Sequence, residues 1–163
     1  MDIEKRIREH RAIISGICCP ERKVNILTLA RILRLAMEIS REGREGRKIG
    51  TMFVISDTDR TLGHSRPLIL DPLYGHPISR KHIDDLNARE TVKELAQLDG
   101  AFIVSDEGYF LSACRYINAS SEGIELQLGL GSRHMAAASI TKKTNAVAVV
   151  VSESSMVRVF DNG

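Results

Sequence analysis

The chain has 163 residues, of which 43% are apolar and 27% are charged, and its formal net charge is +2. This composition excludes intrinsic disorder, which needs low hydrophobicity and high charge, and the length predicts one compact core. The small net charge gives no overall field that would attract nucleic acid, so no nucleic-acid partner is expected. Any phosphate chemistry must therefore come from a local site.

The three cysteines are Cys18, Cys19 and Cys114, an odd number with two adjacent. This pattern predicts neither a disulfide framework nor a Cys-x-x-Cys metal site, and it fits a reducing cytoplasm. The longest strongly apolar stretch, residues 146–151, is far too short to cross a bilayer, so no membrane partner is expected. We predict a soluble cytoplasmic protein.

The N-terminal part predicts two helices followed by a strand. Residues 2–14 predict a charged helix, and a second helix is expected from near Pro20 to near Arg41, because its apolar residues form a broad stripe. Glycines and charges interrupt this pattern over residues 42–50. The apolar run Thr51–Ile55 then predicts a buried strand.

The middle of the chain begins with residues 56–77, rich in Pro, Gly, His and Asp, which predict a long surface connection. Ser79 can cap a helix that extends to about Leu98, and we interpret the polar residues on this helix as a solvated face. These residues are His82, Asp84, Asp85, Arg89 and Glu90. A β-hairpin is expected over residues 101–117, with Gly108 in its turn.

The C-terminal part predicts a helix over residues 132–143 and strands at residues 146–152 and 156–160. Helices at both ends of a strand-rich middle, with hairpins rather than regular βαβ alternation, favour a mixed sheet covered by helices. The predicted fold class is α/β: a single globular domain with a mixed, mostly antiparallel sheet. Residues 1–46 are expected to form a helical segment that packs on a core of residues 47–163.

The strongest local signal is the segment Leu128–His134, where two glycines precede a predicted helix. Glycines allow a close backbone approach, and a helix N-terminus offers free N–H groups and its positive dipole end to a phosphate. Ser132 can cap the helix, Arg133 can donate two hydrogen bonds to phosphate oxygens, and His134 adds a donor. The alternative is a glycine turn with an ordinary cap and a surface arginine. The spacing excludes a P-loop and a dinucleotide-binding fingerprint.

Two carboxylates stand at the ends of predicted strands. Asp99 precedes the small residues Gly100 and Ala101, so a ligand could approach the backbone there while Asp99 holds a cation or accepts a proton. On its own, an Asp-Gly pair is typical of a turn. Ser152 and Glu153 stand at the end of another strand, where a glutamate is more often solvated than functional. Neither carboxylate alone predicts a site.

Three motifs in this order resemble the diadenylate cyclase domain family: Asp99-Gly-Ala101, Gly131-Ser-Arg-His134 and Val151-Ser-Glu153. The similarity extends from about residue 49 to the C-terminus, and residues 42–46 resemble the archaeal-type branch. The resemblance implies an enzyme that joins two ATP molecules into cyclic di-AMP and releases two pyrophosphates. It also implies self-association into a face-to-face dimer or larger homo-oligomer, in which each 3′-hydroxyl attacks the other nucleotide.

The resemblance further implies roles for individual residues. Asp99, Arg133 and His134 would be catalytic, and Asp99 and Glu153 would bind a divalent metal, Mn²⁺ or Mg²⁺. The residues implied in nucleotide binding are Gly100, Ala101, Tyr116, Ile117, Gly131, Ser132, Arg133, His134, Ser152 and Glu153.

The chain also departs from the family pattern. Tyr116 and Ile117 resemble the family's adenine-contacting pair, but Met135 stands where many relatives have a second arginine, and Leu98 where some have a histidine. The missing arginine leaves a second function open, a sensor domain that binds ATP or a cyclic dinucleotide and has lost catalysis. A non-catalytic assembly domain with a structural glycine loop is the third possibility.

Overall fold

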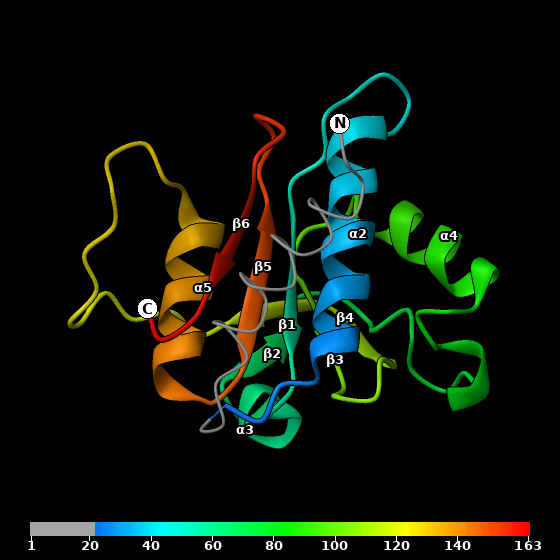
Figure 1. Cartoon of the computed structure of the whole chain (residues 1–163), viewed down its shortest axis with the longest axis horizontal. Helices are drawn as coiled ribbons and strands as arrows, with labels where there is room; N and C mark the ends of the chain where they lie inside the picture. Colours follow the sequence, from blue (N-terminus) through cyan, green and yellow to red (C-terminus); the bar gives the residue numbers. More distant parts are fainter. Residues whose placement is uncertain (1–21) are drawn as a thin grey trace, which may run out of the picture.

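The computed structural model describes residues 22–163. The helix expected over residues 2–14 lies outside this range. Within the described range, no helix is both long enough and apolar enough to cross a membrane. The described strands form one sheet, and helices cover both of its faces (Figure 1).

Helix α2 (Ile26–Glu42) begins later than the position near Pro20 expected from the sequence. The reason is a local cap at Asn25, whose side chain accepts hydrogen bonds from the backbone N–H groups of Leu27 and Thr28. The helix ends at Gly43, which has a φ of 60° and donates its N–H to a carbonyl of the last turn.

The sheet has six strands in the order β2-β4-β3-β1-β5-β6. Their bounds are β1 Thr51–Ile55, β2 Ser65–Pro67, β3 Ala101–Val104, β4 Phe110–Ile117, β5 Val147–Val151 and β6 Val157–Phe160. Only β1 and β3 pair in parallel, and every other neighbouring pair is antiparallel. The predicted mixed, mostly antiparallel α/β sheet is therefore confirmed, together with the strands expected around residues 51–55, 101–117 and 146–160.

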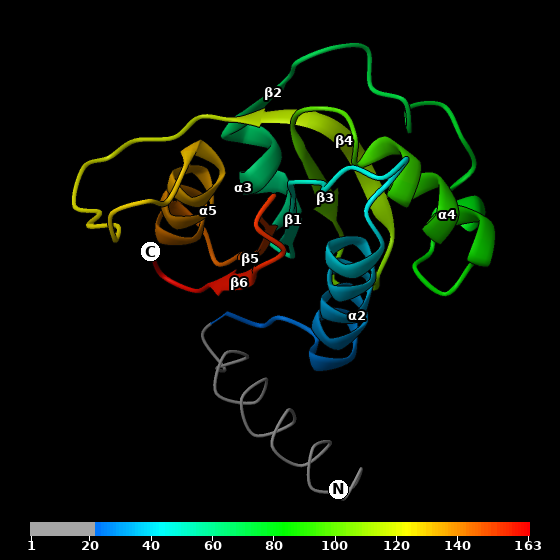
Figure 2. The same cartoon turned by 90° about the horizontal axis from the view of Figure 1, so that it is seen from above.

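The sheet separates two layers of helices (Figures 1 and 2). Phe53 and Ile55 of β1 belong to the buried cluster on the side of α2 and α4 (Leu86–Leu95). Met52 and Val54, which point the other way, belong to the cluster on the side of α5 (Ser132–Lys143). Every residue of β1 and β5 is buried, because both faces of these central strands are covered.

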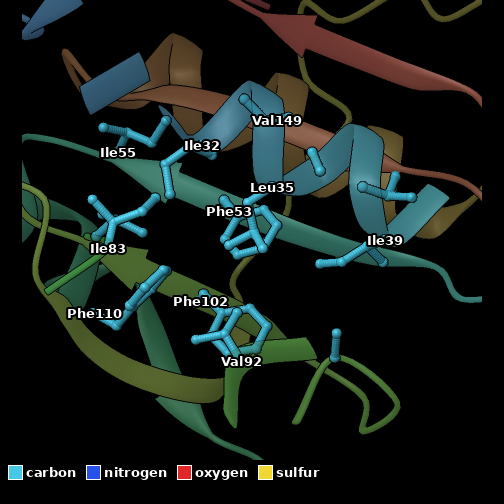
Figure 3. Close-up of a cluster of buried hydrophobic side chains, with 14 of the residues drawn as sticks. Ile32, Leu35, Ile39, Phe53, Ile55, Ile83, Val92, Phe102, Phe110 and Val149 are labelled. Atoms are coloured by element: carbon cyan, nitrogen blue, oxygen red, sulfur yellow. The ribbon is translucent and has the colours of Figure 1, made fainter. Parts of the chain in front are cut away.

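Three aromatic rings hold the larger cluster together (Figure 3). Phe53 stacks on Phe102 with ring centroids 5.0 Å apart, and Phe110 meets both rings at a tilt. Leu35 of α2 is fully buried in the same cluster. Burying each such side chain contributes about 1.5–3 kcal/mol, so α2 is an integral part of the core.

The region 56–77 is not the continuous surface connection that the sequence predicts. It contains the short helix α3 (Thr58–Gly63) and the edge strand β2. A six-residue helix is too short to show periodicity, and β2, with the sequence Ser-Arg-Pro, lacks the apolar pattern of a strand. Pro67 is tolerated in β2 because β2 is an edge strand.

The helix expected from Ser79 is also shorter than predicted. Ser79 lies in a 3₁₀ turn (Ile78–Arg80), and α4 starts only after Asp85, whose side chain accepts a hydrogen bond from the N–H of Ala88. Two candidate caps compete in this stretch, and the carboxylate of Asp85 is the one placed to satisfy a free N–H group.

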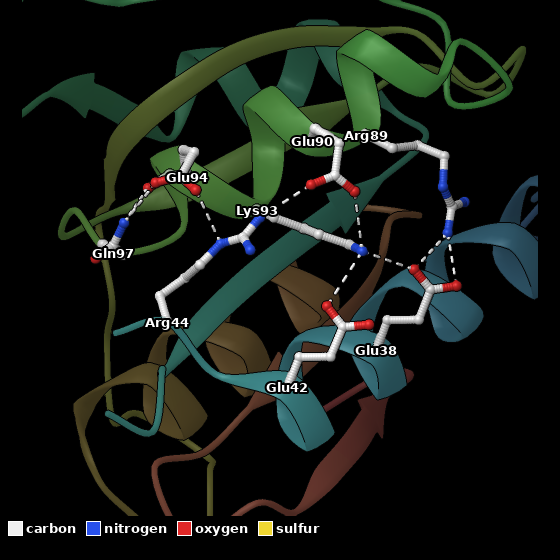
Figure 4. Close-up of polar contacts among 8 residues, drawn as sticks. All are labelled: Glu38, Glu42, Arg44, Arg89, Glu90, Lys93, Glu94 and Gln97. Atoms are coloured by element: carbon white, nitrogen blue, oxygen red, sulfur yellow. Dashed lines mark hydrogen bonds and ion pairs between the residues drawn. The ribbon is translucent and has the colours of Figure 1, made fainter. Parts of the chain in front are cut away.

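Asp84 and Glu90 are exposed, as the predicted solvated face requires, but Arg89 and Lys93 of α4 face α2 instead. Arg89 donates two hydrogen bonds to Glu38 of α2, and Lys93, almost fully buried, pairs with Glu38, Glu42 and Glu90 (Figure 4). Burial raises the pKa of Glu38, but the hydrogen bonds from Lys93 and Arg89 outweigh burial and hold that pKa below its ordinary value. This charged network fastens α4 to α2.

Candidate functional site

The topology brings three chain segments to one edge of the sheet. β1 and β3 run parallel, and β5 runs antiparallel to β1 with Val151 opposite Thr51. The beginnings of β1 and β3 therefore lie beside the end of β5. Asp99 comes just before β3, and Glu153 comes just after β5. The two carboxylates, distant in the sequence, approach one another for this reason.

Arg133, in the first turn of α5, lies between the two carboxylates. Its Nη2 atom is 3.6 Å from Asp99 Oδ1, and its Nη1 atom is 3.6 Å from Glu153 Oε1. Both distances exceed a normal hydrogen bond, so the guanidinium is held electrostatically and its donors stay available to a ligand. The side chains of Asp99 and Glu153 are 90% and 72% exposed, which leaves both carboxylates open to solvent.

Gly50 makes room for this arrangement at the start of β1. A Cβ atom on Gly50 would lie 2.5 Å from Arg133 Nη1 and 3.3 Å from Cγ of Glu153. Any larger residue would therefore push the arginine away from the carboxylates. In the sequence, the signal for Gly50 is a glycine directly before a buried strand, which alone does not indicate a site residue.

Gly100 is required by the backbone around it. Its φ is +106°, and a Cβ atom there would lie 2.6–2.7 Å from backbone atoms of Cys114 and Arg115. Cys114 itself has a φ of 56°, and the pairing of β3 with β4 shifts register near this point. The glycine after Asp99 thus allows β3 and β4 to approach each other at the site.

A cavity of about 290 Å³ opens beside Asp99 and Arg133, and we call it the apolar cavity. Its apolar lining consists of Met52, Leu68, Ile117, Ala119, Met135 and Ala136. The residues implied by the family resemblance that line it are Asp99, Gly100, Ala101, Tyr116, Ile117, Ser132 and Arg133. Tyr116 is 44% exposed, and the guanidinium carbon of Arg66 lies 4.6 Å from its ring centroid, which restrains the ring. The cavity combines an apolar surface with polar groups, as ligand sites do.

The N-terminus of α5 meets the same cavity. Gly131 occupies the cap position and Ser132 is the first helical residue, without a side-chain capping bond, so the expectation that Ser132 caps the helix is wrong. The carbonyl of Gly131 accepts the first hydrogen bonds, from the N–H groups of His134 and Met135. The preceding N–H groups, of Ser132 and Arg133, have no acceptor within the helix and carry its positive dipole end.

His134 does not line the apolar cavity in this structure. It is only 7% exposed, its ring packs edge-on against Phe160 at 6.0 Å, and neither ring nitrogen has a hydrogen-bond partner among the described residues. Burial, with a smaller contribution from Arg158 and Arg133, lowers the pKa of His134. The neutral imidazole is therefore favoured, and the catalytic role implied for His134 stays a prediction.

Ser152 does not line the cavity either; its side chain stabilises the turn that follows β5. Its Oγ accepts a hydrogen bond from the N–H of Met156 and lies 2.7 Å from Oγ of Ser154. The N–H of Ser152 also donates to the carbonyl of Met156. The turn fixes the position of Glu153, so the structure places Ser152 as a support for its neighbour.

A second cavity of about 200 Å³ adjoins the site, and we call it the basic cavity. Its charged lining consists of Arg44, Arg47, Lys48, Asp99, Arg133 and Glu153. Asp99 and Arg133 line both cavities. In the sequence, the three additional cations form only a charge cluster between a predicted helix and a predicted strand.

The two exposed carboxylates are hard oxygen ligands of the kind that Mg²⁺ and Mn²⁺ prefer. Among residues 22–163, no group of three or more His, Cys, Asp or Glu side chains is placed to hold a metal ion. Mg²⁺ commonly binds through one or two carboxylates together with substrate phosphates and water. Asp99 and Glu153 therefore fit a metal that binds together with a phosphate ligand.

Comparison with known families decides the classification. The model of the DAC family, described as DisA bacterial checkpoint controller nucleotide-binding, matches residues 38–163. The chain belongs to this DAC family. The matched region contains every strand of the described residues 22–163, the two carboxylates and both cavities.

Two curated relatives are both named diadenylate cyclase. A diadenylate cyclase of Methanocaldococcus jannaschii is 52% identical over 137 residues, which cover 83% of this chain and 43% of that protein. A diadenylate cyclase of Haloferax volcanii is 39% identical over 133 residues, which cover 81% of this chain and 48% of that protein. The chain thus spans less than half the length of these relatives.

Solved structures support the fold. A protein described as a hypothetical membrane spanning protein from Bacillus cereus superposes with a TM-score of 0.62 at 20% identity, over 83% of this chain and 60% of that one. A double mutant of DacA from Staphylococcus aureus gives a TM-score of 0.54 at 18% identity, over 83% of this chain and 82% of that one. At these identities the likeness concerns the α/β architecture alone.

Proposed function

We propose that this DAC-family chain is a diadenylate cyclase domain, which condenses two ATP molecules into cyclic di-AMP and two pyrophosphates. The observation that carries the proposal is the meeting of Asp99, Arg133 and Glu153 at one edge of the sheet, beside the apolar cavity. The names of the two archaeal relatives support the same activity.

In the proposed reaction, the 3′-hydroxyl oxygen of one ATP attacks the α-phosphorus of a second ATP. A phosphodiester bond forms, the bond from the α-phosphorus to the oxygen that bridges to the β-phosphate breaks, and pyrophosphate leaves with the electron pair. A carboxylate as exposed as Asp99 can accept the hydroxyl proton. Arg133 can donate two hydrogen bonds to the phosphate oxygens, where negative charge increases during the transfer.

A divalent metal, Mn²⁺ or Mg²⁺, belongs to this proposal. Asp99 and Glu153 would hold it together with phosphate oxygens, since both are exposed hard ligands on either side of Arg133. When bound, the metal would act as a Lewis acid that neutralises phosphate charge.

The reaction also requires two protomers. Each protomer offers one apolar cavity with one Asp99, so one protomer presents one nucleotide and one base. Two protomers placed face to face would let each 3′-hydroxyl reach the α-phosphate held by the partner. We therefore include a face-to-face dimer, alone or within a larger homo-oligomer, in the proposal.

The direct experiment separates turnover from binding. The purified chain is incubated with ATP and Mg²⁺ or Mn²⁺, and products are identified by liquid chromatography and mass spectrometry. We expect Asp99→Asn to lower turnover by about 10²-fold or more, because the proton acceptor is lost, and to retain affinity for ATP. Asp59→Asn, at an exposed aspartate of α3, is the matched control and should keep wild-type turnover. Full turnover by Asp99→Asn would contradict the assigned role.

A second candidate function is a nucleotide sensor without catalysis. The observation that favours it is Met135, which lines the apolar cavity with an uncharged side chain. A sensor would bind ATP or cyclic di-AMP and form no product with either metal. The same incubation therefore decides between the two functions.

A further inference from the structure

The proposed site is short of positive charge. A nucleoside triphosphate carries several negative charges, and Arg133 lies between two carboxylates. Arg115 also lines the apolar cavity, but its guanidinium donates to the carbonyl groups of Leu62 and Ser65 and to Oγ of Ser65. The proposed divalent metal would neutralise part of the phosphate charge, and further cations would bind the distal phosphates of the nucleotide directly.

The cations of the basic cavity come from a tight turn between α2 and β1. Residues 43–48 form it, and we call them the basic hairpin. The N–H of Arg44 donates to the carbonyl of Arg47, and the N–H of Arg47 donates back to Arg44. Glu45 and Gly46, between them, both have positive φ, as a type I′ turn requires. Gly43 also has positive φ, and a Cβ atom there would lie 2.3 Å from the carbonyl oxygen of Arg47. The hairpin thus has a defined shape.

The hairpin is fixed to helix α4 by Arg44. Its Nη2 atom is 3.2 Å from Glu90 and its Nε atom is 3.1 Å from Glu94 (Figure 4). The charge of Arg44 is therefore balanced by carboxylates of α4 and is not available to a ligand. The two remaining cations, Arg47 and Lys48, are exposed, and within residues 22–163 neither lies within ion-pair distance of a carboxylate.

The basic cavity continues the apolar cavity. Asp99 and Arg133 line both, so the cavities meet at this pair. A nucleotide whose base lies in the apolar cavity, near Tyr116, and whose α-phosphate lies at Asp99 and Arg133 would extend its outer phosphates towards Arg47 and Lys48. The order of the cavities matches the order of groups in ATP.

We infer that Arg47 and Lys48 form the binding subsite for the β- and γ-phosphates of ATP, and for the pyrophosphate before it departs. The inference rests on the proposed function, because it assumes a nucleoside triphosphate in the apolar cavity. It also accounts for Met135: the hairpin supplies the charge that a second arginine of α5 would otherwise provide. Because Arg44 pairs with Glu90 and Glu94 of α4, the fold holds Arg47 and Lys48 in place.

The test compares a triphosphate with a monophosphate of the same nucleoside. Calorimetric titrations with 3′-deoxy-ATP and 3′-deoxy-AMP, which lack the attacking hydroxyl, are performed on the full chain in the presence of Mg²⁺. We expect Arg47→Gln and Lys48→Gln each to weaken 3′-deoxy-ATP binding by about tenfold, because each removes a charge-assisted contact. Binding of 3′-deoxy-AMP should change by less than about twofold, since it has no distal phosphates.

Two controls separate a loss of phosphate contacts from a general effect of charge or of folding. Arg41→Gln removes the same charge from an exposed position at the end of α2 and should leave both affinities unchanged. Thermal unfolding should be the same for all variants, because Arg47 and Lys48 are exposed.

Four results would contradict the proposed subsite. Unchanged triphosphate affinity in Arg47→Gln and Lys48→Gln would show that the hairpin does not touch the ligand. An equal loss with the monophosphate, or an equal loss in Arg41→Gln, would show a general effect of charge or folding. If the wild-type chain binds neither nucleotide, the proposed function fails and the subsite fails with it, an outcome that the wild-type titrations alone reveal.

Discussion

At the scale of one residue, Gly100 allows the close backbone approach on which the proposed site depends. It follows the proposed proton acceptor, and its missing Cβ lets the backbone of Cys114 pass close to β3. A side chain at this position meets both a steric conflict and an unfavourable φ. The position of Asp99 therefore depends on the absence of a Cβ atom at Gly100.

We predict that Gly100→Ala lowers the free energy of unfolding by about 2 kcal/mol or more, because the conflict involves rigid backbone atoms and positive φ. Urea unfolding followed by circular dichroism measures the change. Gly63→Ala is the matched control, since nothing lies within 4 Å of a Cβ atom there and its φ is not positive. A Gly100→Ala protein as stable as the control would disprove the close approach.

Individual site residues were predictable from the sequence to different degrees. The motifs containing Asp99, Arg133 and Glu153 pointed to one site, and the structure brings these three side chains together. The burial of His134 could not be predicted, because it depends on the contact between α5 and Phe160 of β6. Lys48 was missed because nothing in a charge cluster tells which cations find partners.

At the scale of elements, length and pattern decided what could be foreseen. The predicted bounds of β1 and α5 are correct, because β1 is a continuous apolar run and α5 follows a pair of glycines. α3 and β2 are too short for a pattern. The start of α4 was misplaced because Ser79 and Asp85 both resemble caps, and the network between α2 and α4 exists only once the helices meet.

That network makes the stability of the α2–α4 contact depend on pH. The pKa of Glu38 is lowered in the folded protein, so the unfolded chain binds the proton more readily. The contribution of Glu38 is therefore complete above the ordinary glutamate pKa and is lost as the pH falls through the folded value. Below that range, a protonated Glu38 no longer balances Arg89 and Lys93.

We predict that Glu38→Gln costs about 1–3 kcal/mol of unfolding free energy near neutral pH, since two poorly exposed cations lose a partner. The difference from wild type should shrink between about pH 7 and about pH 3. Urea titrations at both values measure it, and Glu125→Gln, at an exposed glutamate, serves as control. A difference that stays constant with pH would refute the role of the network.

At the scale of the whole molecule, one protomer contains half of the proposed reaction centre. One protomer contributes an apolar cavity, one Asp99 and the basic hairpin. Closing a ring of two nucleotides requires two attacks, and each attack uses one base. In the proposed dimer, both protomers must therefore be competent for the cyclic product to form.

Mixed assemblies test this requirement. Wild-type chain and Asp99→Asn are co-refolded in equal amounts, so that about half of the dimers contain one chain of each kind and about a quarter are wild type. We predict that cyclic di-AMP forms at about a quarter of the rate given by the same total amount of wild-type chain, because only wild-type pairs complete both attacks. A linear dinucleotide should accumulate from the mixed pairs. A rate near one half would indicate protomers that act independently.

The ratio of pyrophosphate to cyclic di-AMP is the most direct test of the proposed reaction. The chain is incubated with ATP and Mn²⁺ or Mg²⁺, cyclic di-AMP is quantified by mass spectrometry, and pyrophosphate is quantified in the same samples. We predict two pyrophosphates for every cyclic di-AMP, and a reduction of both products by about 10²-fold or more in Asp99→Asn. Release of ADP and inorganic phosphate, a linear dinucleotide as the final product, or ATP binding without any product would contradict it.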